Sequence, residues 1–199
     1  MRETVALDPV LRLTLCGALA LLFLVAAIHK LRDLRGFRRA VREYALLPPS
    51  WLTWTPVAVA AVELTLAMGL VLPWAGPVPG LAGAAVLALY TSAIAINLYR
   101  GRRHIDCGCA GPAGSVPIGR GLVVRNAVLI AAALACTVPA APRSLVWLDA
   151  VTVCGGIVAL ALLYAAADVG LANAARLQTL ATDHSPHAET TEDLSWSKR

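Results

Sequence analysis

The sequence predicts an all-α, multi-pass transmembrane helical bundle, and three observations lead to that prediction. Of the 199 residues, 58% are hydrophobic and 15% are charged, and the mean hydropathy is +0.69. The apolar residues form long continuous runs instead of alternating, which favours helices over strands in a bilayer. A soluble domain carries about 25% charged residues. The composition therefore excludes a soluble enzyme.

Five apolar segments are long enough, with tilt, to cross about 30 Å of hydrocarbon as helices. They cover about residues 10–28, 57–74, 81–99, 122–139 and 146–167. The first could be a cleaved signal peptide, but Glu3 and Asp8 precede it and basic residues follow it, which favours a retained span. We therefore expect one transmembrane domain over residues 1–170. Residues 171–199 are expected to form a polar, disordered tail.

Basic residues divide unequally between the two sides of the predicted bundle. With five spans, 14 of the 17 Lys and Arg residues fall on the side of the two long loops, which begin near Lys30 and Arg100. The positive-inside rule then places the N-terminus outside and both loops in the cytoplasm of a bacterial inner membrane. Apolar residues recur at helical spacing from Leu31 to Val41, which is typical of an interfacial helix, although an ordinary basic loop is equally compatible. The charge indicates orientation in a lipid bilayer and not nucleic-acid binding.

The second long loop carries the strongest indication of chemistry, two cysteines separated by one glycine. A glycine between Cys107 and Cys109 removes a side chain that would obstruct a disulfide between them. Such a bridge is strained and exchanges readily with other thiols. Arg102, Arg103 and His104 precede the pair, and their positive charge favours the thiolate that attacks a disulfide. The spacing therefore favours thiol–disulfide exchange.

Two other interpretations of this loop remain open. His104 could join Cys107 and Cys109 in a metal site, although structural zinc needs four ligands and the sequence offers no second cluster. The cysteines could also form a structural disulfide or an inert turn.

Polar residues inside the predicted spans are further candidates. Glu63 lies near the middle of the second span, where an ionised carboxylate is costly, so we expect it to be protonated or hydrogen-bonded to Tyr90 or its neighbours on the third span. Its role could be a proton relay or a quinone contact, or only a structural hydrogen bond. Arg125 and Asn126 begin the fourth span and could clamp the cysteine loop, or the end of the third span through Asn97, whereas snorkelling to the interface is the alternative for Arg125.

Three more cysteines, Cys16, Cys136 and Cys154, lie within the predicted spans. A second redox pair among them would allow electrons to cross the membrane. Lone buried cysteines mostly behave as small hydrophobic residues, and we favour that interpretation.

The order and spacing of several motifs resemble those of the MauE family over about residues 15–135. The similar segments are Arg100-Gly101, Asp106-Cys107-Gly108-Cys109-Ala110-Gly111, Leu122-Val123-Val124-Arg125-Asn126, His29-Lys30-Leu31 leading to Phe37, Tyr44-Ala45-Leu46-Leu47-Pro48, and Glu63. Ala110 departs from the family pattern, which has an aromatic residue after the second cysteine. The resemblance implies a four-helix DoxX-like core. It also implies a role in maturation of the disulfide-rich small subunit of methylamine dehydrogenase, alongside a thioredoxin-like partner, MauD.

The residues and the resemblance together predict a membrane protein that supports thiol–disulfide exchange and the maturation of a disulfide-containing client. Cys107 and Cys109 would be the working pair of a thiol–disulfide oxidoreductase. The alternative is a non-catalytic scaffold that holds a thioredoxin-like partner. The sequence identifies no cofactor, although a quinone would suit a redox role. The charge distribution places the pair in the cytoplasm, whereas disulfides form outside it.

Overall fold

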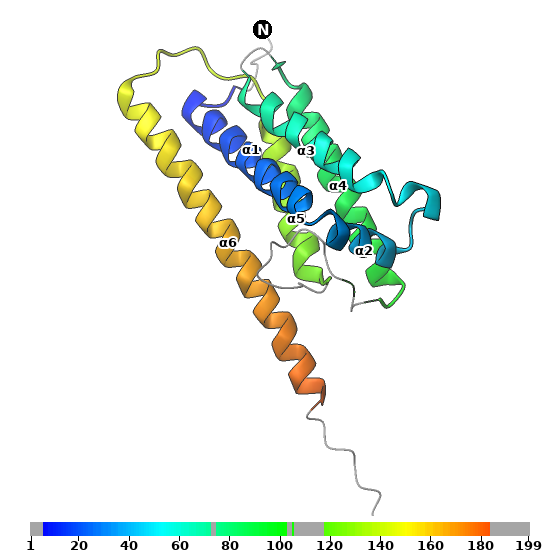
Figure 1. Cartoon of the computed structure of the whole chain (residues 1–199). Coiled ribbons are helices and arrows are strands. Elements are labelled where there is room, and N and C mark those ends of the chain that lie inside the picture. The colour runs from blue at the N-terminus through cyan, green and yellow to red at the C-terminus, as the bar shows by residue number, and fades with distance from the viewer. Residues whose placement is uncertain (1–5, 73–74, 103–104, 106–117, 184–199) are drawn as a thin grey trace, which may run out of the picture.

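The computed structural model describes residues 6–72, 75–102, 105 and 118–183. Over these residues the chain folds into helices alone, and the prediction of an all-α protein is confirmed (Figure 1). The elements are α1 (Pro9–Arg32), α2 (Leu34–Tyr44), the short 3₁₀ helix η1 (Pro49–Trp51), α3 (Thr55–Val71), α4 (Val78–Tyr99), α5 (Arg120–Ala135) and α6 (Trp147–Asp183).

The helix lengths fit a multi-pass membrane protein. In the described part of the chain, α1, α4 and the segment Trp147–Ala174 of α6 are long and apolar enough to span a bilayer. The helices α3 and α5 have 17 and 16 residues. At the rise of an α-helix they are about 25 Å long, slightly less than the hydrocarbon core. The fourth expected span runs to residue 139, but α5 ends at Ala135 and the chain then leaves the helix.

Side-chain caps explain how the first two helices begin. Asp8 accepts a 2.8 Å hydrogen bond from the backbone N–H of Val10, and Pro9 occupies the first turn of α1, where its missing N–H costs nothing. Asp33 separates α1 from α2, and its side chain accepts a 2.8 Å bond from the N–H of Gly36. The helix expected between Leu31 and Val41 is therefore a separate element, α2.

The centre of the bundle is α1, which packs against α3, α5 and α6, while α4 packs against α5 and α3. Phe23 of α1 is 1% exposed at the middle of the core, and Gly83 of α4 faces its ring. A Cβ on Gly80 would lie 2.8 Å from the carbonyl oxygen of Ala133, so α4 and α5 are nearly in backbone contact. Small residues commonly permit such close approach in membrane helices.

The longest helix, α6, lies at the edge of the bundle and extends beyond it (Figure 1). None of its apolar window is buried. It approaches α1 closely where Gly17 meets Ile157 and where Gly156 meets Thr14. The helix continues to Asp183, past residue 171, where the sequence predicts a polar tail; residues 184–199 of that tail lie outside the described residues.

The two ends of the bundle are built differently. At the loop end, α1 leads into α2, and α4 ends where the loop to α5 begins. At the strap end, residues 137–146 form a connection between α5 and α6 that we call the strap. Leu7 pairs with the strap through its N–H to Pro139 (3.0 Å) and through its carbonyl to the N–H of Ala141 (2.8 Å).

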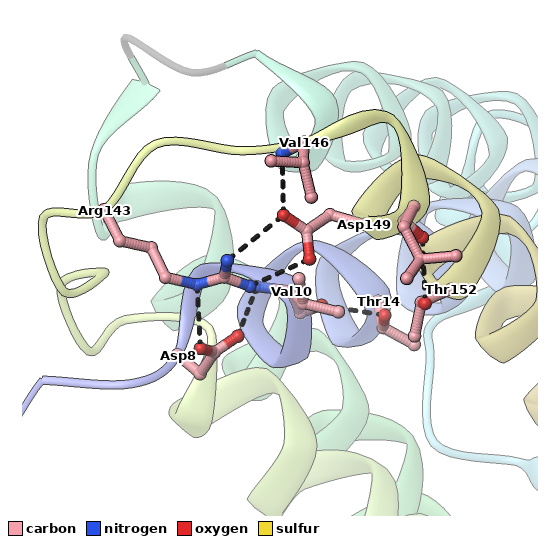
Figure 2. Close-up of polar contacts among 8 residues, drawn as sticks. Asp8, Val10, Thr14, Arg143, Val146, Asp149 and Thr152 are labelled. Carbon is pink, nitrogen blue, oxygen red and sulfur yellow. Dashed lines mark hydrogen bonds and ion pairs between the residues drawn. The ribbon is translucent and has the colours of Figure 1, made fainter.

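Arg143 fastens the strap to two helices (Figure 2). Its Nε lies 3.1 Å from Asp8 at the start of α1, and its terminal nitrogens lie 3.0 and 3.1 Å from the carboxylate of Asp149 in α6. The N–H of Val146 donates to the same carboxylate at 2.9 Å. The strap is thus held by a charged contact at its middle and by backbone hydrogen bonds near its start.

The charge of Asp8 is expected to hold the strap in place. The N–H of Val10 and, after it, Arg143 lower the pKa of Asp8 below its usual value of 3.8. A depressed pKa in the folded state means that the ion pair contributes stability above pH 3.8 and that this contribution is lost as the pH falls through the folded-state pKa. Asp8→Asn keeps an N-cap residue but removes the charge, whereas Asp8→Ala removes both. At pH 7, strap mobility is therefore expected to rise from wild type to Asp8→Asn to Asp8→Ala.

A spin label at the exposed position 140 measures that mobility by electron paramagnetic resonance. Acidification below pH 3.8 is expected to mobilise the label in the wild type more than in Asp8→Asn. The contact between Arg143 and Asp149 is present in both proteins, so it contributes equally to the label mobility measured in each. Equal mobility of the label in wild type and Asp8→Asn at every pH would show that Asp8 does not fasten the strap.

Candidate functional site

A buried ion pair joins α1 to α3 near the loop end. The Nζ of Lys30 lies 2.8 and 2.9 Å from the two carboxylate oxygens of Glu63. The two side chains are only 3% and 2% exposed. The hydroxyl of Tyr90 on α4 donates a 2.9 Å hydrogen bond to Oε1 of Glu63. The buried carboxylate of Glu63 thus has polar partners on two neighbouring helices. These contacts compensate for the hydration that the carboxylate loses inside the bundle.

Aromatic rings enclose the ammonium group of this pair. Lys30 Nζ lies 5.2 Å from the ring centroid of Phe37 on α2 and 5.9 Å from that of Tyr90. Both distances suit a cation–π interaction. The pair therefore connects four helices, because α2 contributes Phe37 and α4 contributes Tyr90.

The sequence identified Glu63 and one of its partners but missed the other. The expected contact of Glu63 with Tyr90 is present. Lys30 was interpreted as the first of many loop charges, because it stands at the end of an apolar run beside several arginines. The available signal was its position in the last turn of α1, on the same face as Ala27 and Phe23, which are also buried.

A second charged cluster links α5 to α6. Arg125 forms an ion pair with Asp168, and the two side chains are 11% and 24% exposed. Its guanidinium also donates to the amide oxygen of Asn126 at 3.2 Å and lies 5.2 Å from the ring of Tyr164. Arg125 thus turns toward α6. Tyr164 and Asp168 are four residues apart and therefore lie on one face of α6. This spacing in the sequence could have indicated that both contact the same residue.

Asn97 and Asn126 are the buried amides at this end, 0% and 3% exposed. The amide nitrogen of Asn97 donates to the carbonyl of Ala93, and its backbone carbonyl accepts from the N–H of Arg102. Among the described residues, its Oδ1 has no hydrogen-bond partner. The guanidinium of Arg125 is directed to Asn126 and Asp168.

Both ends of the cysteine loop are fixed to the bundle. The N–H of Ile118 donates to the carbonyl of Ile105 at 3.0 Å, so the chain closes on itself at the base of the loop. Ile105 and Ile118 are 8% and 3% exposed. They pack with Ile94 of α4 and Leu122 of α5 in one apolar cluster, which we call the isoleucine cluster. The loop thus starts and ends in the packed core of the loop end.

Two further contacts join the loop base to other elements. Arg102, which is exposed, reaches the carbonyl of Glu43 at the end of α2 with a 3.5 Å contact. Tyr44 of α2 and Leu171 of α6 pack against the isoleucine cluster. A Cβ on Gly121 would lie 2.3 Å from Leu171, which shows how closely α6 approaches the start of α5.

The remaining predicted site residues lie outside the described residues. These are Cys107 and Cys109 together with Arg103 and His104. The described residues contain no group of three or more His, Cys, Asp or Glu side chains that could hold a metal ion. Glu63, Arg125 and Asn126 all lie toward the loop end, but they form two separate clusters on different helices.

The part of the chain that matches a known protein family includes most of this bundle. Residues 8–139 match the family described as "Methylamine utilisation protein MauE". This chain belongs to the MauE family. The match runs from α1 through α5 into the strap, so it covers the buried ion pair and the cysteine loop. The helix α6 lies beyond it.

Several relatives carry the name "Methylamine utilization protein MauE", and three of them are compared below. The protein of Paracoccus denitrificans is 43% identical over 118 residues, which cover 59% of this chain and 63% of that protein. That of Paracoccus versutus is 36% identical over 70% of this chain and 76% of its own length. That of Methylophilus methylotrophus is 33% identical over 84% of this chain and 89% of its own length. No solved structure matches the chain.

Proposed function

We propose that this MauE-family membrane protein carries out thiol–disulfide exchange that supports the maturation of a disulfide-containing partner, with Cys107 and Cys109 as the exchanging pair. The observation that supports this most is the anchored loop base. Cys107 follows Ile105 by two residues, which reach at most about 7 Å. The loop that carries the pair therefore begins and ends at the apolar cluster of Ile105 and Ile118.

The chemistry needs only the two thiols and a partner disulfide. The thiolate of one cysteine attacks a sulfur of the partner's disulfide, and the mixed disulfide forms as the partner's other sulfur leaves with a proton. The second cysteine then attacks the mixed disulfide and releases the partner as a dithiol. The loop ends as the Cys107–Cys109 disulfide, and two electrons have passed to the partner. The reverse sequence oxidises the partner.

The described residues support this chemistry by positioning. The Lys30–Glu63 pair fixes α1, α2, α3 and α4 relative to one another, and the Arg125–Asp168 pair fixes the start of α5 to α6. Arg102 adds an exposed positive charge at the start of the loop, and Arg103 and His104 add theirs in sequence. Positive charge next to a cysteine favours its thiolate. These residues are positioning residues, since the exchange itself takes place at sulfur.

The names of the relatives and the family resemblance suggest the pathway. We place the protein in methylamine metabolism, with the small subunit of methylamine dehydrogenase as client and a thioredoxin-like, MauD-like protein as partner. We propose the bacterial inner membrane as its location, and the charge distribution favours an N-terminus outside and a cysteine loop in the cytoplasm. On that orientation the pair receives electrons from a cytoplasmic donor.

Serine substitution of each loop cysteine tests the proposal. Cys107→Ser and Cys109→Ser are each expected to abolish maturation of the client, because neither cysteine alone can complete the exchange. One of the two is expected to accumulate a mixed disulfide with the partner, visible on a non-reducing gel. Cys154→Ser is the matched control, since Cys154 is exposed on α6. Normal maturation in the Cys107→Ser/Cys109→Ser double variant would establish the non-catalytic scaffold instead.

Labelling with a membrane-impermeant maleimide tests the orientation. The variant used keeps Cys107 and Cys109 and has Ala in place of Cys16, Cys136 and Cys154. Labelling only after the cells are opened is expected, and it would place the pair in the cytoplasm. Labelling of intact cells that requires a reductant would place an oxidised pair outside, and the exchange would then act directly on exported proteins.

A further inference from the structure

Two cysteines from opposite parts of the sequence meet at the strap end. Cys16 lies two turns inside α1, and Cys136 is the residue at which α5 ends. Both belong to one buried cluster of the core, and Arg12, one turn before Cys16, donates a hydrogen bond to the carbonyl of Cys136. They are 6% and 2% exposed, and neither is part of a disulfide. Two buried cysteines on helices that pack against each other can be joined by a disulfide if side-chain rotation brings their sulfur atoms together.

The surroundings of the pair are apolar except for one cation. Both cysteines belong to the core cluster that contains Leu19 and Phe23. Arg12 lies one helical turn before Cys16, and its Nε donates a 3.3 Å hydrogen bond to the carbonyl of Cys136. The guanidinium is therefore held beside the pair, where it can balance the negative charge of a thiolate that forms during exchange.

The strap provides access to the buried pair. Cys136 directly precedes the strap, and the strap is fastened through Leu7 and through Arg143, which is 39% exposed. Exposed ion pairs such as these break at little cost. We therefore expect release of the strap to make Cys136, the residue directly before it, more mobile and more accessible. Figure 2 shows that the fastening residues come from the first turns of α1 and α6 and from the strap itself.

We propose that Cys16 and Cys136 form a second redox-active site, a dithiol that an external disulfide oxidises to a disulfide between α1 and the end of α5. One thiolate attacks the external disulfide, forming a mixed disulfide and releasing one thiolate, which takes up a proton. The other cysteine displaces the second thiol. The pair loses two electrons and two protons, and the external disulfide gains them. This site lies at the other end of the bundle from Ile105 and Ile118 at the base of the cysteine loop, and it does not depend on the function of Cys107 and Cys109.

The experiment isolates this pair in the full-length protein. A variant with Ser in place of Cys107, Cys109 and Cys154 is incubated, in membrane vesicles, with oxidised glutathione. Remaining thiols are then blocked with N-ethylmaleimide, and the intact mass is measured. We expect both thiols to disappear together, with the loss of two hydrogen atoms and without retained glutathione. Peptide mapping is expected to show Cys16 joined to Cys136.

Matched controls distinguish two cysteines that react together as a pair from two thiols that react independently. A variant that retains Cys16 and Cys154 has the same number of thiols but lacks Cys136, and it is expected to gain glutathione and form no internal disulfide. Arg143→Gln, which releases the strap, is expected to speed oxidation of the Cys16–Cys136 pair several-fold. The proposal is overturned if the folded protein keeps both thiols reduced in oxidised glutathione while the same protein forms the disulfide after denaturation in detergent.

Discussion

Glu63→Leu is expected to lower the free energy of unfolding by about 3–5 kcal/mol, because it leaves the ammonium of Lys30 buried without its counter-ion. The side chain of Lys30 is 3% exposed, so water cannot replace the lost carboxylate. Unfolding of the purified protein in mixed micelles, titrated with a denaturing detergent, measures the loss. Tyr90→Phe is the milder control, since it removes one hydrogen bond to the carboxylate and is expected to cost about 1.5–3 kcal/mol.

The double variant Lys30→Met/Glu63→Leu decides whether the pair acts as a unit. Removing both charges together is expected to restore most of the stability, because the cost of the single change comes from the unpaired charge and not from lost attraction. Each apolar replacement is close in length to the side chain that it replaces. A double variant whose loss of stability equals the sum of the losses in Glu63→Leu and Lys30→Met would show that the two residues contribute independently.

The same double variant also tests the positioning role at the loop end. If Lys30 and Glu63 only hold α1, α2, α3 and α4 in place, the stable double variant should exchange thiols through Cys107 and Cys109 at nearly the wild-type rate. A folded double variant that has lost exchange would mean that the charges themselves act on the reaction, for example by moving a proton.

The helices could be predicted from the sequence because lipid imposes a simple requirement. Every backbone group must be hydrogen-bonded within the span, so a continuous apolar run of sufficient length becomes a helix. The five expected segments correspond to α1, α3, α4, α5 and α6. The strap was not predicted as a separate feature. Val138 continues the apolar run past Ala135, and only the backbone pairing of Pro139 and Ala141 with Leu7 shows where the helix stops.

The rotation of each helix could not be predicted, because hydropathy does not distinguish protein from lipid. The helices α1 and α6 have nearly equal hydropathy, 2.3 and 2.2, yet 28% of the α1 window and none of the α6 window is buried. In water, an apolar face identifies the side that packs, but lipid tails are as apolar as a protein core. For this reason, the meeting of Cys16 with Cys136 and of Arg125 with Asp168 depended on the structure.

The charge count used for orientation also changes once the partners are known. Lys30, Arg125 and Arg143 are each paired with carboxylates: Glu63, Asp168, and Asp8 with Asp149. The positive-inside rule concerns free basic residues near the ends of spans. Removing the three paired residues takes two from the basic side and one from the other, so the asymmetry persists. Four of the 12 basic residues that remain on that side are exposed on α2, namely Arg35, Arg38, Arg39 and Arg42.

Gly80→Val is expected to be the most damaging substitution at the strap end, with a loss of about 3 kcal/mol in the free energy of unfolding. A Cβ at Gly80 would lie 2.8 Å from the carbonyl oxygen of Ala133 and 3.0 Å from Cγ2 of Thr137. The first of these is a backbone atom, which cannot rotate away, so α4 and α5 must separate. Unfolding in mixed micelles measures the loss directly.

Gly155→Val is the matched control, because the same residue type is changed within a helix and no atom lies within 4 Å of the added Cβ. It is expected to change stability by less than about 0.5 kcal/mol. Separation of α4 from α5 would also move Cys136, which follows α5, away from Cys16 on α1. Gly80→Val should therefore slow the oxidation of that pair by glutathione, whereas Gly155→Val should leave the rate unchanged. Equal stability of the two variants would contradict the close α4–α5 contact on which both expectations depend.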